Sequence, residues 1–261
     1  MADVKNRRLA VANWKMNPSN LAQSLKLFNV FKKVSAKATF VQVVVCAPYI
    51  YIPALLAETN SNRLLIGAQD ASSEKVGPYT GEVSASQLGT LGVNSVIIGH
   101  SERRAMGESN ELIARKVDSV LKEGMRAILC VGESTRDTEG VFLNFVKQQL
   151  EECLANVPRR YFLNLIIAYE PLWAISTHAT ATETPDDMLQ MSIFIRKTLG
   201  AICGKDIAVK IPILYGGSVT DLTASAYLSE GGADGVLVGK ASLSAESFSE
   251  IIKSINALKV N

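Results

Sequence analysis

The sequence has few of the residues that build metal and redox sites. Its 261 residues include only four cysteines and two histidines. The cysteines, which are Cys46, Cys130, Cys153 and Cys203, are widely spaced and form no CxxC pair. A zinc site or a redox-active pair is therefore not indicated. We expect four buried free thiols, no metal site and no cofactor.

Long apolar runs and blocks of like charge are also missing. The formal net charge is +2, and basic and acidic residues are mixed along the chain. This gives no reason to expect nucleic acid or a membrane surface as a partner. No segment approaches the roughly 20 apolar residues of a spanning helix, and the start of the chain lacks the apolar core of a signal peptide. We therefore expect a cytoplasmic protein.

What the chain does contain is a series of short apolar runs from one end to the other. Each is nearly continuous in Val, Ile, Leu and Ala, which is typical of parallel strands buried on both faces. Helical periodicity lies between them: in the segment 108–124, Ile113, Val117, Val120 and Leu121 fall on one face. The expected strands are 9–13, 41–47, 63–69, 94–100, 126–133, 164–170, 211–217 and 234–239, and further helices are expected at 184–200, 221–232 and 244–259.

This alternation predicts a single closed barrel. Strand and helix alternate about eight times over roughly 250 residues, which is the count and size of an eight-stranded α/β barrel. An open doubly wound sheet is the alternative, but it usually has fewer strands, and no GxGxxG opens the first helix. No linker-like tract interrupts the pattern. We predict an α/β fold, a single-domain (β/α)8 barrel over residues 1–261.

Polar residues and glycine turns stand at the ends of several expected strands. The carboxyl ends of the strands in such a barrel share one rim, where its chemistry is carried. Each residue alone has a plain structural explanation, but together they predict one site. They are Asn13 and Lys15 after the first strand, His100 after the fourth, Glu170 after the sixth, and the turns 215–219 and 237–240 after the seventh and eighth.

Short motifs at these positions match a known family. NWKMN, IGHSERR, CVGE, AYEPLWAI, YGGSV and LVGKASL occur in order and at suitable spacing, and GAQD and GPYTGEVS add to the match. The chain therefore resembles the triosephosphate isomerase family over essentially its whole length. The resemblance implies a TIM barrel. It also implies the interconversion of dihydroxyacetone phosphate and glyceraldehyde 3-phosphate by proton transfer through an enediolate.

The resemblance implies roles for five catalytic residues. Glu170 would be the base that removes a carbon-bound proton, and His100 an uncharged donor to the substrate oxygens. Lys15 would supply positive charge near the developing oxyanion, with Asn13 orienting it. Glu102 is expected beside this cluster, either as a partner of Lys15 or a proton-handling group, or merely in a plain ion pair.

The resemblance also implies a phosphate site built largely from backbone N–H groups. Gly217, Ser218 and Gly239 follow the last two strands, where glycine lets the backbone approach an anion closely. Ser176 is expected to offer its N–H from the lid segment after Glu170. Lys240 stands where the family usually has glycine, and it either adds charge near the phosphate or points away.

The lid segment departs from the family pattern. Residues 176–181 read STHATA, where Gly-Thr-Gly-Lys-Thr-Ala is usual. Serine can still offer its N–H unless a positive φ is required, so we expect a working lid with altered opening, and His178 facing solvent. The alternative is a phosphometabolite-binding barrel with impaired catalysis. A Schiff-base barrel lyase or aldolase is a second alternative, but the sixth strand has no suitable lysine.

The loop GPYTGEVS at 77–84 resembles the one with which family members reach a partner's active site. Thr80 and Glu82 are the residues expected to reach across. A closed homodimer follows from the resemblance, because a symmetric pair allows each subunit to contribute the same loop to the other.

Overall fold

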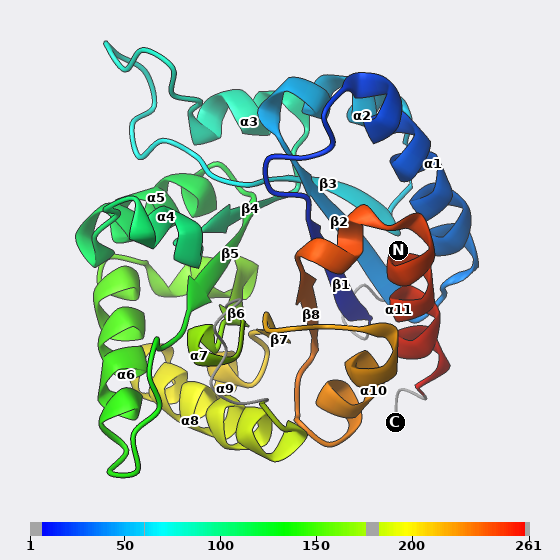
Figure 1. Cartoon of the computed structure of the whole chain (residues 1–261). Coiled ribbons are helices and arrows are strands. Elements are labelled where there is room, and N and C mark those ends of the chain that lie inside the picture. Colours follow the sequence, from blue (N-terminus) through cyan, green and yellow to red (C-terminus); the bar gives the residue numbers. More distant parts are fainter. Residues whose placement is uncertain (1–6, 60, 176–182, 259–261) are drawn as a thin grey trace.

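Eight parallel strands close into a barrel in the order of the sequence (Figure 1). The computed structural model describes residues 7–59, 61–175 and 183–258. Each strand pairs with the next, β8 pairs with β1, and helices form a ring around the strands. The predicted (β/α)8 barrel is confirmed. The strands are β1 (Arg8–Asn13), β2 (Val41–Ala47), β3 (Leu64–Ala68), β4 (Ser95–Ile98), β5 (Arg126–Val131), β6 (Leu165–Tyr169), β7 (Ile213–Tyr215) and β8 (Gly235–Val238).

The helices between the strands bury one face against the barrel. The α-helices are α1 (Leu21–Lys37), α2 (Ile52–Ala57), α3 (Ala85–Leu91), α4 (Ser101–Ala105), α5 (Asn110–Lys122), α6 (Val141–Leu154), α7 (Leu172–Ile175), α8 (Pro185–Cys203), α9 (Lys205–Ala208), α10 (Asp221–Ser229) and α11 (Ala245–Ala257). Short 3₁₀ turns are η2 (Tyr49–Tyr51), η3 (Arg159–Asn164) and η4 (Lys240–Leu243). The four apolar residues predicted to share a face of α5 are all fully buried.

Helix α8 begins as predicted but ends later. The Thr184 and Asp187 side chains form a reciprocal capping box, with Pro185 at the first position of the helix. The expected end at Gly200 is wrong, because the helix continues to Cys203, which is buried. Gly204, at φ 93°, ends it instead, in a backbone region that glycine enters without steric cost.

The strands are packed on both faces, as their continuous apolar sequences predict. In β2, Val44 and Cys46 belong to the cluster inside the barrel, while Val43 and Val45 pack outward under the helices. All four cysteines are free and buried, which confirms that prediction. Within the described ranges, no helix combines the length and apolar character needed to cross a membrane.

Candidate active site

Glu170 and His100 meet at the carboxyl end of the barrel, although β5 lies between their strands. Glu170 is the first residue after β6, and its Oε1 lies 3.1 Å from His100 Nε2. Its Oε2 accepts a hydrogen bond of 3.0 Å from the Ser101 backbone N–H. Both side chains are buried. Two residues that the sequence placed on one rim are therefore in direct contact.

The orientation of His100 follows from its place at the start of α4. His100 is the N-cap residue, and its Nδ1 accepts a hydrogen bond of 3.2 Å from the Glu102 backbone N–H. An accepting Nδ1 carries no proton, so this contact assigns the proton of the uncharged ring to Nε2. Nε2 is the nitrogen that faces Glu170. The start of α4 thus fixes the ring as a donor toward the site.

Lys15 has an unusual backbone conformation that its neighbours hold in place. Its φ is 52°, in the left-handed region that residues other than glycine seldom occupy. Its N–H donates to Asn13 Oδ1 at 3.0 Å, and its carbonyl accepts from Gln69 Nε2 at 2.8 Å. The side chain then reaches Glu102, with 2.6 Å between Nζ and Oε1. Asn13 thus fixes the direction of Lys15, and Glu102 is in an ion pair.

Two glycines allow the ends of β5 and β7 to approach the backbone at Glu170 closely. A Cβ added at Gly132, after β5, would lie 1.8 Å from the Glu170 carbonyl oxygen. One at Gly216, after β7, would lie 3.0 Å from the Tyr169 carbonyl oxygen, to which the Gly216 N–H donates. The Glu170 N–H donates to the Val131 carbonyl at 2.8 Å. Glu170 is therefore clamped from both sides by backbone.

Glu133 anchors the chain that follows Glu170. Its Oε1 accepts hydrogen bonds of 2.8 Å from both the Tyr169 hydroxyl and Trp173 Nε1. Burial raises the pKa of this carboxyl. The sequence contained Glu133 only as part of the CVGE motif, and nothing in the pattern of residues pointed to its two partners. The contact holds α7 against the end of β6.

Arg104 joins the ends of β4 and β5 beneath the site. Its Nε donates to the Gly99 carbonyl at 2.8 Å, and its Nη2 donates to the Cys130 carbonyl at 3.0 Å. Gly99 precedes His100 and has a φ of 70°. One guanidinium therefore fixes the backbone just before His100 and ties it to the next strand, a role that the SERR motif did not reveal.

The two glycine turns lie at this same end of the barrel. A Cβ added at Gly217 would lie 2.1 Å from the Tyr215 hydroxyl oxygen, so this ring packs directly over the turn. A Cβ added at Gly239 would lie 3.4 Å from Lys15 Cε. Ser218 donates a long hydrogen bond to the Ala174 carbonyl at 3.4 Å. Lys240 is exposed at the start of η4.

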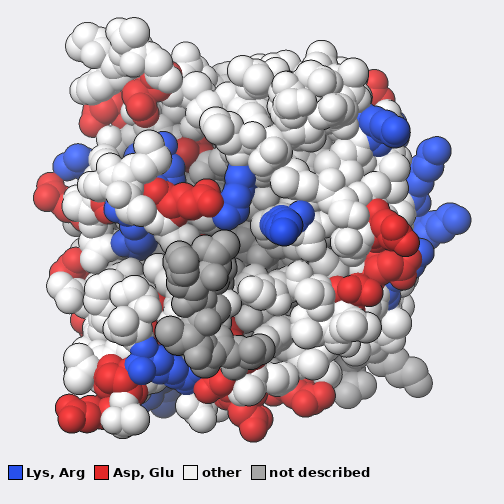
Figure 2. All heavy atoms as spheres, viewed as in Figure 1, with Lys and Arg blue, Asp and Glu red and all other residues white. Residues whose placement is uncertain are grey.

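The remaining candidate residues fall outside this cluster. Ser176 and His178 lie outside the described residues. Thr80 and Glu82 are exposed on the loop between β3 and α3, which projects from the barrel in Figure 1. On the face of the molecule that Figure 2 shows, acidic and basic side chains are interspersed. Among the described residues, no group of three or more His, Cys, Asp or Glu side chains could hold a metal ion.

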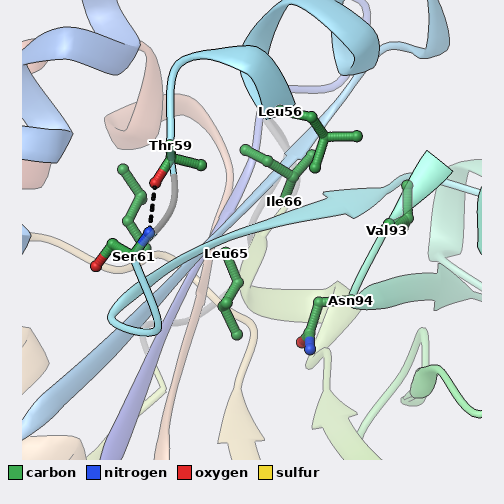
Figure 3. A pocket seen from close by; sticks show the side chains of 9 residues that line it. Leu56, Thr59, Ser61, Leu65, Ile66, Val93 and Asn94 are labelled. Atoms are coloured by element: carbon green, nitrogen blue, oxygen red, sulfur yellow. Dashed lines mark hydrogen bonds between the residues drawn. The ribbon is translucent and has the colours of Figure 1, made fainter.

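A surface depression elsewhere lacks comparable chemistry. A hollow of about 270 Å³ lies at the opposite end of the barrel, where β3 begins (Figure 3). Leu56, Ile66 and Val93 line it together with Thr59 and Asn94. None of its lining residues titrates near neutral pH. The Glu170 cluster is therefore the stronger candidate for catalysis.

Comparison with known proteins gives one consistent result. A family model described as triosephosphate isomerase matches residues 8–255. A triosephosphate isomerase of Flavobacterium johnsoniae is 38% identical over 252 residues, covering 95% of this chain and 99% of the relative. That of Fusobacterium nucleatum is 40% identical over 253 residues, covering 96% and 100%. That of Carboxydothermus hydrogenoformans is 41% identical over 246 residues, covering 92% and 96%.

Proposed function

Because this chain belongs to the triosephosphate isomerase family, we propose that Glu170, His100 and Lys15 perform the family's reaction at the mouth of the barrel. The chain is an isomerase that interconverts dihydroxyacetone phosphate and glyceraldehyde 3-phosphate. The observation that carries the assignment of residues is the 3.1 Å contact between Glu170 and His100. It brings a carboxylate and an uncharged donor to one place.

Glu170 is the base of the proposed mechanism. Its carboxylate removes a proton from the carbon next to the substrate carbonyl and returns that proton to the neighbouring carbon. The close backbone contacts of Gly132 and Gly216, together with the hydrogen bond from the Ser101 N–H, fix the position of the carboxylate before it takes up the proton. Positioned acid–base groups of this kind typically contribute about two to four orders of magnitude in rate.

His100 and Lys15 stabilise the enediolate that forms between these two steps. The His100 Nε2–H donates to the substrate oxygens and exchanges a proton with them, so that no net proton is consumed. Lys15 places its ammonium group on the same rim, oriented by Asn13. Glu102 is within 2.6 Å of Lys15 Nζ, which supports its role as the partner of that lysine.

The phosphate is held by the turns after β7 and β8. We assign the phosphate to the backbone N–H groups of Gly217, Ser218 and Gly239, because turns that contain glycine let the backbone approach an anion closely. Lys240 and Lys15 add positive charge at this end, and Ser176 adds an N–H from the segment after α7. Lys240 has no ion-pair partner among the described residues.

Substituting alanine for Gly217 is expected to weaken phosphate binding. Its Cβ would overlap the Tyr215 hydroxyl, so the turn or the ring must shift. Losing one hydrogen bond to a charged group costs about 1.5–3 kcal/mol, which is roughly a ten- to hundredfold rise in KM. Steady-state kinetics with glyceraldehyde 3-phosphate measure this. The Ser218→Ala variant keeps its N–H and should change KM less; equal KM values for both variants would contradict the assignment.

The loops after β1 to β4 support a homodimer. Met16, Ile50, Val76 and Met106 follow these four neighbouring strands, and each is at least 77% exposed. Large apolar side chains exposed on the loops of four neighbouring strands favour an interface over this part of the rim. We propose that the β3–α3 loop, which carries the exposed Val76, packs on a second copy, with Thr80 and Glu82 near that copy's site.

Shortening the loop 77–83 is expected to weaken association and activity together. The subunit would lose the segment that completes its partner's site. Sedimentation equilibrium measures association, and the coupled isomerase assay measures activity on the same samples. The Val76→Asp variant places a charge on the same surface without removing any chain. A stable monomer with full activity would rule out this role for the loop.

The whole chain, residues 1–261, is proposed to form one cytoplasmic domain. All eight strands belong to a single closed sheet, which supports one domain. The alternative of impaired catalysis depended on residues 176–180, which lie outside the described residues. The comparisons give it no support.

A coupled isomerase assay on the purified protein tests the proposed function. Glu170→Gln serves as the control variant, and phosphoglycolate binding is measured in parallel. Turnover that falls with this substitution supports the assignment. Phosphoglycolate binding without turnover in either protein would instead favour a binding barrel.

A further inference from the structure

Arg136 is a partly buried cation that the proposed mechanism does not use. It lies in the loop between β5 and α6, and 17% of its side chain is exposed. The next residue, Asp137, fixes this loop to the start of α6, because its carboxylate accepts hydrogen bonds of 2.8 Å from the Val141 N–H and 2.9 Å from the Phe142 N–H. The backbone that carries Arg136 is therefore held in place, and its side chain contacts two further helices.

The guanidinium of Arg136 lies over two aromatic rings. Its central carbon is 4.9 Å from the ring centroid of Phe142, on α6, and 5.4 Å from that of Trp173, on α7. Both distances are within the roughly 6 Å at which a cation is attracted to the face of an aromatic ring. Glu133 holds the edge of the same indole, because Trp173 Nε1 donates to its carboxylate at 2.8 Å. Trp173 is thus held at its edge by one side chain and at its face by another.

Arg136 also forms an ion pair with the first turn of α8. Its Nη1 lies 2.9 Å from Asp187 Oδ1. The other carboxylate oxygen, Oδ2, accepts hydrogen bonds of 3.0 Å from the Thr184 N–H and 2.7 Å from the Thr184 hydroxyl, which cap the helix. Because the pair is largely shielded from water, removing one partner costs more than at an exposed site. One guanidinium therefore connects α6, α7 and α8, which lie on the same side of the barrel in Figure 1.

Two buried carboxyls near this cluster respond to the charge of Arg136. Burial raises the pKa of Glu133, and it raises the pKa of Glu183 to about 8; the positive charge of Arg136 opposes the rise at both. Glu183 directly precedes the capping residue of α8. Burying carboxyl groups is costly without a compensating cation, so an uncharged side chain of similar size cannot replace Arg136.

Helix α7 connects the proposed base to the phosphate turn. It begins two residues after Glu170, and its Ala174 carbonyl accepts the hydrogen bond of 3.4 Å from the Ser218 hydroxyl. Ala174 is buried, so α7 cannot shift without disturbing this contact. Glu170 has separate supports in the Ser101 N–H and the glycine contacts on either side. The position of α7 should therefore matter more for the phosphate than for the base.

We propose that Arg136 is a positioning residue for substrate binding: by holding Trp173 and Asp187 together, it keeps α7 in place beside the phosphate turn. The inference rests on the proposed function, because it assumes that the turn after β7 binds the substrate phosphate. It assigns to Arg136 an effect on phosphate binding and little effect on the chemical step. Within the described part of the chain, Arg136 makes no hydrogen bond or ion pair with Glu170.

The experiment compares wild-type protein with Arg136→Gln and Arg136→Lys in KM, kcat and phosphoglycolate affinity. For Arg136→Gln, KM and the phosphoglycolate Kd should each rise about tenfold, the effect of one hydrogen bond to a charged group, with kcat changing less. This effect should exceed that of Ser218→Ala, which removes one long hydrogen bond but leaves α7 where it is. Lysine keeps a cation without the planar group, so Arg136→Lys should fall between wild type and Arg136→Gln.

Arg196→Gln is the matched control for loss of an ion pair. Arg196 also lies on α8, and its Nη2 is 3.0 Å from Asp234 Oδ2, at the opposite end of the barrel, where β8 begins. Arg196→Gln should lower the unfolding temperature but leave KM and the phosphoglycolate Kd at their wild-type values. Thermal unfolding of all variants separates a loss of stability from a loss of positioning.

A double substitution tests whether Arg136 acts through Trp173. In the Trp173→Leu background, Arg136→Gln should raise KM little further, because the ring that it holds is gone. Tryptophan emission gives a direct signal, since the only other tryptophan, Trp14, is fully buried. Emission should shift to longer wavelength in Arg136→Gln, as Trp173 becomes more exposed to water, and should not shift in Arg196→Gln.

Equal KM and phosphoglycolate affinity for wild type and Arg136→Gln would overturn the inference. So would the same rise in KM for Arg196→Gln, or independent effects of Arg136→Gln and Trp173→Leu. If Arg136→Gln does not fold, Arg136→Lys takes its place, and lower stability with wild-type KM and Kd would overturn the inference in favour of a purely structural role. If the wild-type protein lacks isomerase activity, the proposed function fails, but the phosphoglycolate affinities still test Arg136.

Discussion

Replacing Glu170 with glutamine is expected to lower kcat by about two to four orders of magnitude, with KM close to the wild-type value. Glutamine has the same shape but cannot accept the substrate's carbon-bound proton. Its amide oxygen can still accept the Ser101 N–H, and the backbone clamp from Gly132 and Gly216 is unchanged. The coupled assay, run in both directions, measures the loss.

A matched substitution separates this effect from a general loss of charge. Glu111 lies on the exposed face of α5, in an ion pair of 3.1 Å with Arg115. Exposed pairs of this kind contribute about 0.2–1 kcal/mol to stability, so Glu111→Gln should retain wild-type kcat. If Glu170→Gln and Glu111→Gln had the same kcat, Glu170 would not be the base.

The sequence predicted the position of the site better than its contacts. The carboxyl ends of parallel strands lie on one rim, so the strand pattern alone places the residues that follow the strands at one end of the barrel. Asn13, His100 and Glu170 are all found there. Strand order did not indicate that Glu170 touches His100, because the two strands are not neighbours in the sheet.

The boundaries of β7 show where local pattern is insufficient. The apolar run predicted a strand over 211–217, but β7 covers only Ile213–Tyr215. Pro212 has no N–H for strand pairing, and the last hydrogen bond to β6 is the one that the Gly216 N–H donates to the Tyr169 carbonyl. The end of β7 therefore depends on where β6 ends. The run of apolar residues in the sequence does not contain this information.

The strained backbone of Lys15 and the burial of the Glu183 carboxyl could also not be predicted from the sequence. Lys15 adopts a positive φ because Asn13 and Gln69 hold its backbone on both sides. Glu183 reads as an ordinary polar residue before a helix, yet tertiary packing buries its carboxyl beside Tyr215. Each feature depends on at least one residue distant in sequence, such as Gln69 for Lys15 and Tyr215 for Glu183, and neither has a periodicity that could reveal it.

Replacing His100 with asparagine is expected to lower kcat by about two to three orders of magnitude, the typical loss on removing one oxyanion donor. His100 has two functions in the structure. Its Nδ1 caps α4, and its Nε2–H faces Glu170. Asparagine is a good N-cap residue, but its short side chain does not reach the position of Nε2. The variant should therefore keep the helix and lose the donor.

Thermal unfolding and kinetics on the same variants distinguish these two functions. His100→Asn should unfold close to the wild-type temperature, whereas His100→Ala also loses the cap and about 0.5–2 kcal/mol of stability. Both variants should have similarly low kcat, because both lack the Nε2–H. If kcat instead followed stability, with His100→Asn near wild type, the ring would serve only as the cap of α4. The enediolate would then need another donor, and Lys15 is the cation on the same rim, next to Gly239.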